Sequence, residues 1–372
     1  MTIMAGATIA TSLPQMENVF SANENADLLS RLILTMPAIF IAFLAPVAGY
    51  IIDATGRRKL LIISLFLYAL GGTSGLYFSN IYLILAGRAL LGVAVAGTMT
   101  TTITLIADYF EGKERRDFMG YQAAFMSLGG VIFIFLGGVL ADVHWRWPFA
   151  LYLFSLLVMV LAIKFIEEPQ IKSSVRRAGF VKLSVAPSYV FLIYLMAFLG
   201  FVFFYIVPVE MPFLLRQTTE ISNTIVGISL GVSILMGAVV SFNYSKFKER
   251  MSFPLIYAFT FLFMGAGYIV FWFAGNYVFF LIGLILQGMG TGLLMPNSNL
   301  WLVSIAPDHL RGRLIGNLSF AVYIGQFLSP LIFSPFAKLR GIQPAFGIFG
   351  IMMLFISLAF ILFHYKKYKN QE

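Results

Sequence analysis

Apolar residues occur in long runs along this chain, separated by short polar stretches. Eleven of the runs are long enough for a helix to cross about 30 Å of hydrocarbon at about 1.5 Å per residue. They cover residues 28–52, 60–78, 81–108, 119–141, 146–166, 188–214, 222–243, 253–274, 277–305, 314–336 and 343–364. Residues 2–14 form a twelfth apolar stretch, which would rise only about 20 Å. The pattern predicts an all-α membrane protein whose first helix is truncated at its N-terminus, and we expect the missing half to come from upstream sequence.

Composition supports a membrane protein and excludes several other classes. The chain is 60% hydrophobic and 11% charged, with 39 phenylalanines among 372 residues, more apolar surface than one soluble core could bury. It has no cysteine, which excludes disulfides and thiolate metal sites. The three histidines, His144, His309 and His364, lie far apart at span ends, so we expect no metal site and no cofactor.

The distribution of Lys and Arg predicts the orientation of the chain. If residues 53–59 are cytoplasmic, 19 of the 25 basic residues fall on the cytoplasmic side, 5 fall on the opposite side, and Arg88 alone lies inside a span. The net charge of +9 then reflects topology and anionic lipid, so we expect no nucleic-acid partner. This places the C-terminus in the cytoplasm.

A shift of 196 residues brings the second half of the chain into register with the first. It pairs Gly87 with Gly283, Gly92 with Gly288, Arg115 with Arg311, Gly120 with Gly316 and Gly129 with Gly325. The repeat predicts two six-helix bundles related by a pseudo-two-fold axis, with the substrate site near the middle of the membrane where they meet. We expect the halves at residues 1–166 and 188–372, joined by a cytoplasmic linker at 167–187.

The polar stretch after the first complete span contains residues that a simple basic loop between two spans does not require. Gly49, Asp53 and Gly56 precede Arg57 and Arg58. An anion at the C-terminal end of a helix is unfavourable unless a cation pairs with it, and the two arginines are the nearest candidates for pairing with Asp53. Gly49 lies one turn before Asp53 and leaves room for another helix.

This stretch resembles the loop signature of the major facilitator superfamily, although Ala54 stands where the family usually has a basic residue. The resemblance implies a gate that also uses Asp108, at the cytoplasmic end of the fourth span, although Asp108 could be a simple helix terminus. The second-half counterpart, Ser241–Met251, keeps only its basic residues.

Two further motifs resemble those of proton-coupled members of the family. Arg88, followed by Gly92, resembles the fourth-helix motif linked to proton transfer, while the alternative is an arginine that snorkels toward headgroups. Glycines of the fifth helix resemble the antiporter motif, with Phe133 and Ile134 in place of its Gly-Pro. These packing glycines are Gly120, Gly129, Gly137 and Gly138.

Two carboxylates are further candidates for proton coupling. Glu17 and Glu210 follow Pro14 and Pro208 in the first helices of the two halves, near the outer mouth. Burial would favour the protonated form of a carboxylate there, whereas the positive charge of Arg88 would favour the charged form. For Glu17 a solvated helix end is the alternative.

The resemblance implies that the first, fourth, seventh and tenth spans line a cavity. The candidate lining residues are Thr101, Phe201, Tyr205, Asn297 and Trp301, with packing or lipid contact as the alternative. Aromatic groups with a few uncharged polar groups suit a partly apolar organic solute.

The sequence thus predicts a secondary transporter and not an enzyme, because its spans contain no convergent set of catalytic groups. We expect a monomer in the bacterial cytoplasmic membrane that exports a small organic substrate in exchange for protons. A symporter or facilitator importing a sugar or organic acid is the alternative.

Overall fold

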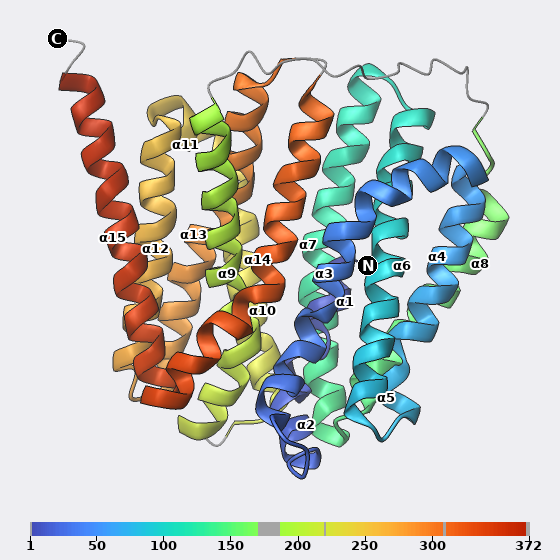
Figure 1. Ribbon diagram of the computed structural model, residues 1–372, viewed down its shortest axis with the longest axis horizontal. Coiled ribbons are helices and arrows are strands. Elements are labelled where there is room, and N and C mark those ends of the chain that lie inside the picture. Colours follow the sequence, from blue (N-terminus) through green and yellow to red (C-terminus); the bar gives the residue numbers. More distant parts are fainter. Residues whose placement is uncertain (1, 170–186, 219–220, 308–309, 370–372) are drawn as a thin grey trace. The chain divides into compact units, whose positions relative to one another are not determined.

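The computed structural model describes residues 2–169, 187–218, 221–307 and 310–369. It divides into two compact units, Met1–Lys182 and Leu183–Glu372. The expected linker at 167–187 lies largely outside the described residues. The described residues form helices and no strands (Figure 1).

The described residues of the first unit form ten helical elements. These are α1 (Thr2–Ala7), the 3₁₀-helix η1 (Ala10–Ser12), α2 (Leu13–Val19), α3 (Ala26–Thr55), α4 (Arg57–Gly72), α5 (Ser74–Tyr77), α6 (Ile81–Tyr109), α7 (Gly112–Val143), the 3₁₀-helix η2 (Trp147–Leu153) and α8 (Phe154–Phe165). Figure 1 shows α3 bending before it reaches α4, and Pro37 and Pro46 inside α3 each remove a backbone donor.

In the part of the second unit that the structure describes there are seven helices. These are α9 (Pro187–Thr218), α10 (Asn223–Phe242), α11 (Tyr244–Arg250), α12 (Phe253–Phe273), α13 (Tyr277–Ile305), α14 (Arg311–Arg340) and α15 (Ile342–Lys369). Across the described residues of both units, 11 helical segments are long and apolar enough to cross a membrane. This confirms the eleven predicted spans.

The apolar stretch at residues 2–14 forms separate helical segments rather than one continuous helix, and its truncation at the N-terminus stays a prediction. α1 ends at Ala7, and η1 leads into α2. Pro14 lies in the first turn of α2, where its missing N–H costs no intrahelical hydrogen bond, so the residue favours a new helix start at this point. Thr8 stabilises the end of α1 by donating a hydrogen bond of 2.7 Å to the Met4 carbonyl.

Helix crossings in the two units use equivalent glycines. In the first unit, a Cβ added to Gly71 would lie 2.7 Å from the Gly87 carbonyl oxygen, where α4 crosses α6. In the second unit, a Cβ added to Gly267 would lie 2.5 Å from the Gly283 carbonyl oxygen, where α12 crosses α13. Both crossings need glycine because the backbones touch. The pairs are related by the 196-residue offset, as the predicted repeat requires.

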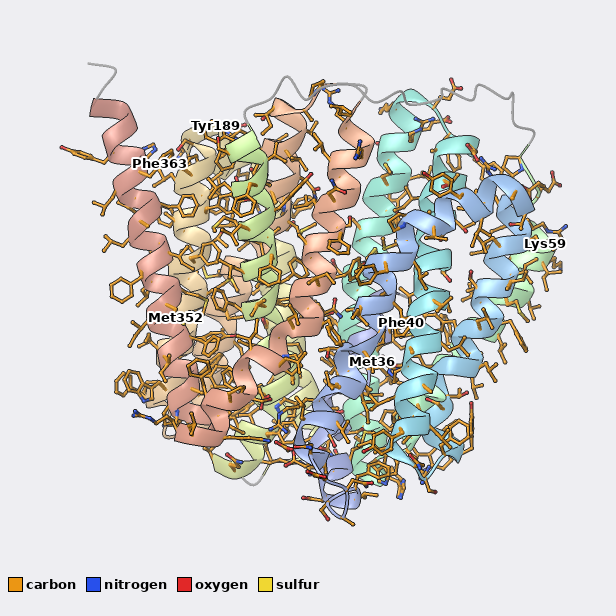
Figure 2. All side chains as sticks on the ribbon, viewed as in Figure 1. Met36, Phe40, Lys59, Tyr189, Met352 and Phe363 are labelled. Atoms are coloured by element: carbon orange, nitrogen blue, oxygen red, sulfur yellow. The ribbon has the colours of Figure 1, made fainter. Side chains whose placement is uncertain are left out.

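A second pair of crossings follows the same offset. A Cβ on Gly92 of α6 would lie 2.5 Å from the Pro37 carbonyl oxygen of α3 and 2.8 Å from the Cβ of Phe40, which Figure 2 labels. A Cβ on Gly288 of α13 would lie 2.4 Å from the Ser233 carbonyl oxygen of α10. The two halves of the sequence therefore build the same internal packing.

Candidate functional site

The loop signature forms a sharp turn between α3 and α4. Gly56 ends α3 with a φ of 87°, in the region that L side chains rarely adopt, so glycine is required here. Its N–H donates to the Ile52 carbonyl at 3.0 Å, which closes the last turn of α3. α4 begins immediately afterwards at Arg57.

Arg57 and Asp108, which the sequence placed in one gate, are in contact. Arg57 Nε donates to Asp108 Oδ2 at 3.0 Å, with 9% of the arginine side chain and 26% of the aspartate side chain exposed. The pair ties the start of α4 to the C-terminal end of α6. Asp108 is therefore more than a helix terminus.

Glu168 completes this cluster, and the sequence analysis missed it. One carboxylate oxygen accepts from the Arg57 backbone N–H at 2.6 Å, and the other accepts from the Arg58 backbone N–H at 2.8 Å. A carboxylate at a helix N-terminus satisfies free donors and complements the helix dipole. The available signal was the pair of acidic residues just before Pro169, after the sixth span.

The remaining gate residues have different surroundings. Arg58 Nη2 donates to the Ile163 carbonyl at 2.6 Å, near the end of α8. A Cβ on Gly49 would meet nothing within 4 Å. The side chain of Asp53 lies outside the described structure, so its part in the gate stays a prediction.

Arg88 is fully buried, which excludes the snorkelling alternative. Its Nε donates to the Ile33 carbonyl at 2.9 Å, and its Nη2 donates to the Ala5 carbonyl of α1. The guanidinium also lies 5.1 Å from the ring centre of Tyr152. Carbonyls at the end of α1 thus balance part of the buried charge, and the arginine holds the interrupted first helix to α3 and α6.

The two candidate carboxylates differ in environment. Glu17 forms an ion pair with Arg31, with Oε2 2.9 Å from Nη1 and 32% of the glutamate side chain exposed. Glu210 of α9 is fully buried. It lies within electrostatic reach of Tyr268, whose hydroxyl donates to the Phe203 carbonyl. Glu210 is the carboxylate with the stronger desolvation.

Two of the predicted cavity residues are used for packing within the second unit. Asn297 is fully buried; its Oδ1 accepts from the Tyr244 hydroxyl at 3.0 Å, and its Nδ2 donates to the Phe253 carbonyl at 3.1 Å. Trp301 stacks on Phe253 with ring centres 5.4 Å apart and packs against Tyr189. We therefore do not carry Asn297 or Trp301 into the proposed substrate site.

The other three cavity candidates differ in exposure. Phe201 and Tyr205 stack on one face of α9, with ring centres 6.4 Å apart, and both are half-buried in the unit. Thr101 of α6 is fully buried, and its hydroxyl has no hydrogen-bond partner among the described residues. These three residues remain proposals.

The glycines of α7 do not behave alike. A Cβ on Gly137 would lie 2.1 Å from the Thr8 carbonyl oxygen, so α7 packs closely on the first helix there. Within the first unit no atom approaches a Cβ built on Gly120 or Gly129 within 4 Å. Gly138 is buried in the same turn as Gly137. A packing role for Gly120 and Gly129 stays a prediction.

A sequence profile described as Major Facilitator Superfamily matches residues 1–259 and 193–372, which together cover the whole chain. The chain belongs to the Major Facilitator Superfamily. It is a multi-pass membrane transporter with the all-α fold of this superfamily, and it is not an enzyme. The described residues contain no group of three or more His, Asp or Glu side chains placed to hold a metal ion.

Curated relatives of this superfamily member include exporters. It is 26% identical to the bacillibactin exporter of Bacillus subtilis, over 97% of this chain and 92% of the relative. It is 28% identical to the quinolone resistance protein NorB of Staphylococcus aureus, over 66% of this chain and 50% of the relative. The match to the MFS-type efflux transporter pyiT of Pyricularia grisea covers only 29% of that protein.

Solved structures of other superfamily members share the fold. A bacterial homologue of the human lysosomal transporter Spinster, in an inward-facing occupied conformation, has a TM-score of 0.80 at 14% identity over 98% of this chain and 94% of that one. A D-xylose–proton symporter has a TM-score of 0.75 at 15% identity over 96% of this chain and 94% of that one. At these identities the likeness concerns the fold alone.

Proposed function

We propose that this transporter exports small organic molecules from a bacterial cell in exchange for protons. The observation that carries the proposal is the similarity to the bacillibactin exporter over nearly the full length of both chains. Proteins named for efflux recur among the other relatives. The protein would lie in the cytoplasmic membrane as a monomer, with its C-terminus in the cytoplasm.

Transport would follow alternating access between two halves, residues 1–166 and 188–372, joined by the linker at 167–187. In the second unit the substrate would contact the aromatic pair Phe201 and Tyr205 of α9. In the first unit Thr101 of α6, which is fully buried, stays a proposed site residue. A half-buried aromatic pair and an unpartnered buried hydroxyl suit a partly apolar solute with a polar group.

Glu210 is the proposed proton-binding group. It is a fully buried carboxylate within a membrane span, and ionisable groups at such positions commonly belong to proton or ion pathways. Arg88 and Glu17 would act indirectly, because Arg88 supports the interrupted first helix and Glu17 is paired with Arg31. Asp53, with Arg57 and Asp108, would form the gate on the cytoplasmic side.

Everted membrane vesicles test the direction and the coupling together. Vesicles containing the protein, supplied with a panel of organic dyes, should accumulate at least one dye when a proton gradient is imposed. Glu210→Gln should abolish gradient-driven accumulation while dye binding to purified protein persists. Uptake of the dye into intact cells, instead of its efflux from them, would overturn the proposal in favour of import. The fold shared with a D-xylose–proton symporter also allows import.

A further inference from the structure

The segment between α10 and α12 is the second-unit counterpart of the turn between α3 and α4. The 196-residue offset relates Arg57 to Phe253 and Asp108 to Ser304. In the first unit these two positions form the ion pair between α4 and α6. In the second unit neither position carries a charge, so the contact between α12 and α13 at this place is of another kind.

An aromatic stack joins the start of α12 to the C-terminal end of α13. The rings of Phe253 and Trp301 are nearly parallel, with an angle of 4° between them and ring centres 5.4 Å apart. Trp301 is only 6% exposed, and Tyr189 of α9 and Tyr257 of α12 also pack against it. Stacked rings attract one another beyond the burial of their surface. The stack therefore holds the two helices together where the first unit uses an ion pair.

Lys248 of α11 extends this stack with a positive charge. Its Nζ lies 4.2 Å from the ring centre of Phe253, within the range of a cation–π contact. The same Nζ donates to the Met251 carbonyl at 3.3 Å, and the side chain is half-buried. Lys248 is one of the basic residues that the second-half counterpart of the loop signature keeps. Its charge is directed at an aromatic ring, whereas that of Arg57 is directed at a carboxylate.

Asn297 of α13 holds both ends of the same segment. Its Oδ1 accepts from the hydroxyl of Tyr244, the first residue of α11, at 3.0 Å. Its Nδ2 donates to the carbonyl of Phe253, the first residue of α12, at 3.1 Å. Asn297 and Trp301 lie one turn apart and therefore on one face of α13. This face of α13 contacts the start of α11 and the start of α12.

We propose that α11 is a strap that closes the segment between α10 and α12 onto α13, and that Lys248 is the positioning residue that locks the strap over the Phe253 ring. Release of the lysine from the ring frees the C-terminal end of α11, while Tyr244 still holds its first residue to Asn297. The second unit thus closes the counterpart of the signature turn with a cation and aromatic rings. The inference goes beyond the proposed export function and holds for either direction of transport.

Apolar packing also acts on the strap, so a test must separate it from the contribution of the cation. Phe247 and Met251 pack against an apolar cluster that includes Tyr244 and Ile256. A substitution of Lys248 that keeps its apolar length leaves this packing in place and removes only the charge. Methionine meets this requirement because it is long and unbranched.

Hydrogen–deuterium exchange on the purified full-length protein tests the proposal without any substrate. Exchange is followed in the peptide covering residues 243–252, and a peptide from the middle of α12, residues 262–270, reports on unfolding of the helix itself. Lys248→Met should speed exchange in the first peptide about two- to five-fold, as expected for loss of one cation–π contact, and leave the second peptide unchanged. Lys248→Arg keeps a cation for the ring and should exchange as the wild type does.

A double-mutant cycle identifies the ring as the partner of the lysine. Phe253→Leu should itself speed exchange, and adding Lys248→Met to it should have no further effect, whereas in Phe253→Tyr the effect of Lys248→Met should persist. Lys246→Met is the matched control, because Lys246 is an exposed lysine of the same helix that donates to Asn243.

Three outcomes would overturn the proposal. The first is an equal effect of Lys248→Met and Lys246→Met, and the second is an effect of Lys248→Met that is additive with that of Phe253→Leu. The third is faster exchange in both peptides, which would show that α12 unfolds and that no strap opens. The contrast between Lys248→Met and Lys248→Arg decides the question even if Phe253→Leu does not fold.

Discussion

The Glu168 carboxylate accepts a hydrogen bond of 2.6 Å from the backbone N–H of Arg57, across 111 residues of sequence. This contact fixes the end of the sixth span to the start of α4, at the turn that carries the family signature. The same turn also receives the ion pair with Asp108. The turn that carries the family signature is therefore held by a residue outside the signature itself.

Removal of the Glu168 cap should destabilise the first unit. Glu168→Ala leaves the first two donors of α4 without their acceptors, and we expect a loss of about 1–2 kcal/mol. Glu168→Gln keeps one acceptor oxygen, so this variant should lose less stability. Thermal unfolding in detergent measures the effect. Glu167→Gln is the matched control because only its backbone carbonyl is engaged, by the Tyr109 hydroxyl; equal destabilisation of both variants would contradict the cap.

The ion pair between Arg57 and Asp108 should contribute only modestly to the stability of the first unit. With a quarter of the aspartate side chain exposed, water screens the pair, so we expect a coupling energy of about 0.5–1 kcal/mol. A double-mutant cycle with Arg57→Gln and Asp108→Asn, read by thermal unfolding, measures it. The coupling should shrink at high salt. A value indistinguishable from zero at low salt would show that the contact is incidental.

The glycine crossings should tolerate no side chain. Gly71→Ala and Gly267→Ala each place a methyl group within 2.7 Å of a backbone carbonyl oxygen, so the helices must separate. We expect loss of folded protein, measured by size-exclusion chromatography after solubilisation. Gly49→Ala is the control, because its Cβ would meet nothing within 4 Å and alanine favours a helix by about 0.5–1 kcal/mol. Normal folding of both crossing variants would refute the packing.

Arg88 should hold the interrupted first helix in place. Arg88→Met removes the donors to the Ala5 and Ile33 carbonyls and should increase hydrogen exchange in residues 2–12 at least ten-fold. Arg88→Lys keeps the charge but has no planar group to span both carbonyls, so its effect should be intermediate. Unchanged exchange in Arg88→Met would mean that packing alone holds the segment.

The elements of the fold could be predicted well because the membrane imposes a simple rule. A span needs about 20 apolar residues, and all its backbone groups must be satisfied within a helix. The eleven spans and the family follow from this rule and from the loop signature. The break after Ala7 did not follow, because it depends on Pro14 together with contacts from Arg88 and Tyr152 that lie far away in sequence.

The sequence by itself determined that this protein is a polytopic transporter of a known family, because hydrophobic length, charge bias and a local signature are properties of adjacent residues. The spacing of Asn297 and Trp301 placed them on one face, but only the tertiary structure decided that this face is packed against Tyr244 and Phe253. The role of Glu168 likewise appeared only when folding brought its carboxylate to the N-terminus of α4. The sequence determines the chemistry of a side chain, whereas the packing of helices that are far apart in the sequence determines which groups that side chain contacts.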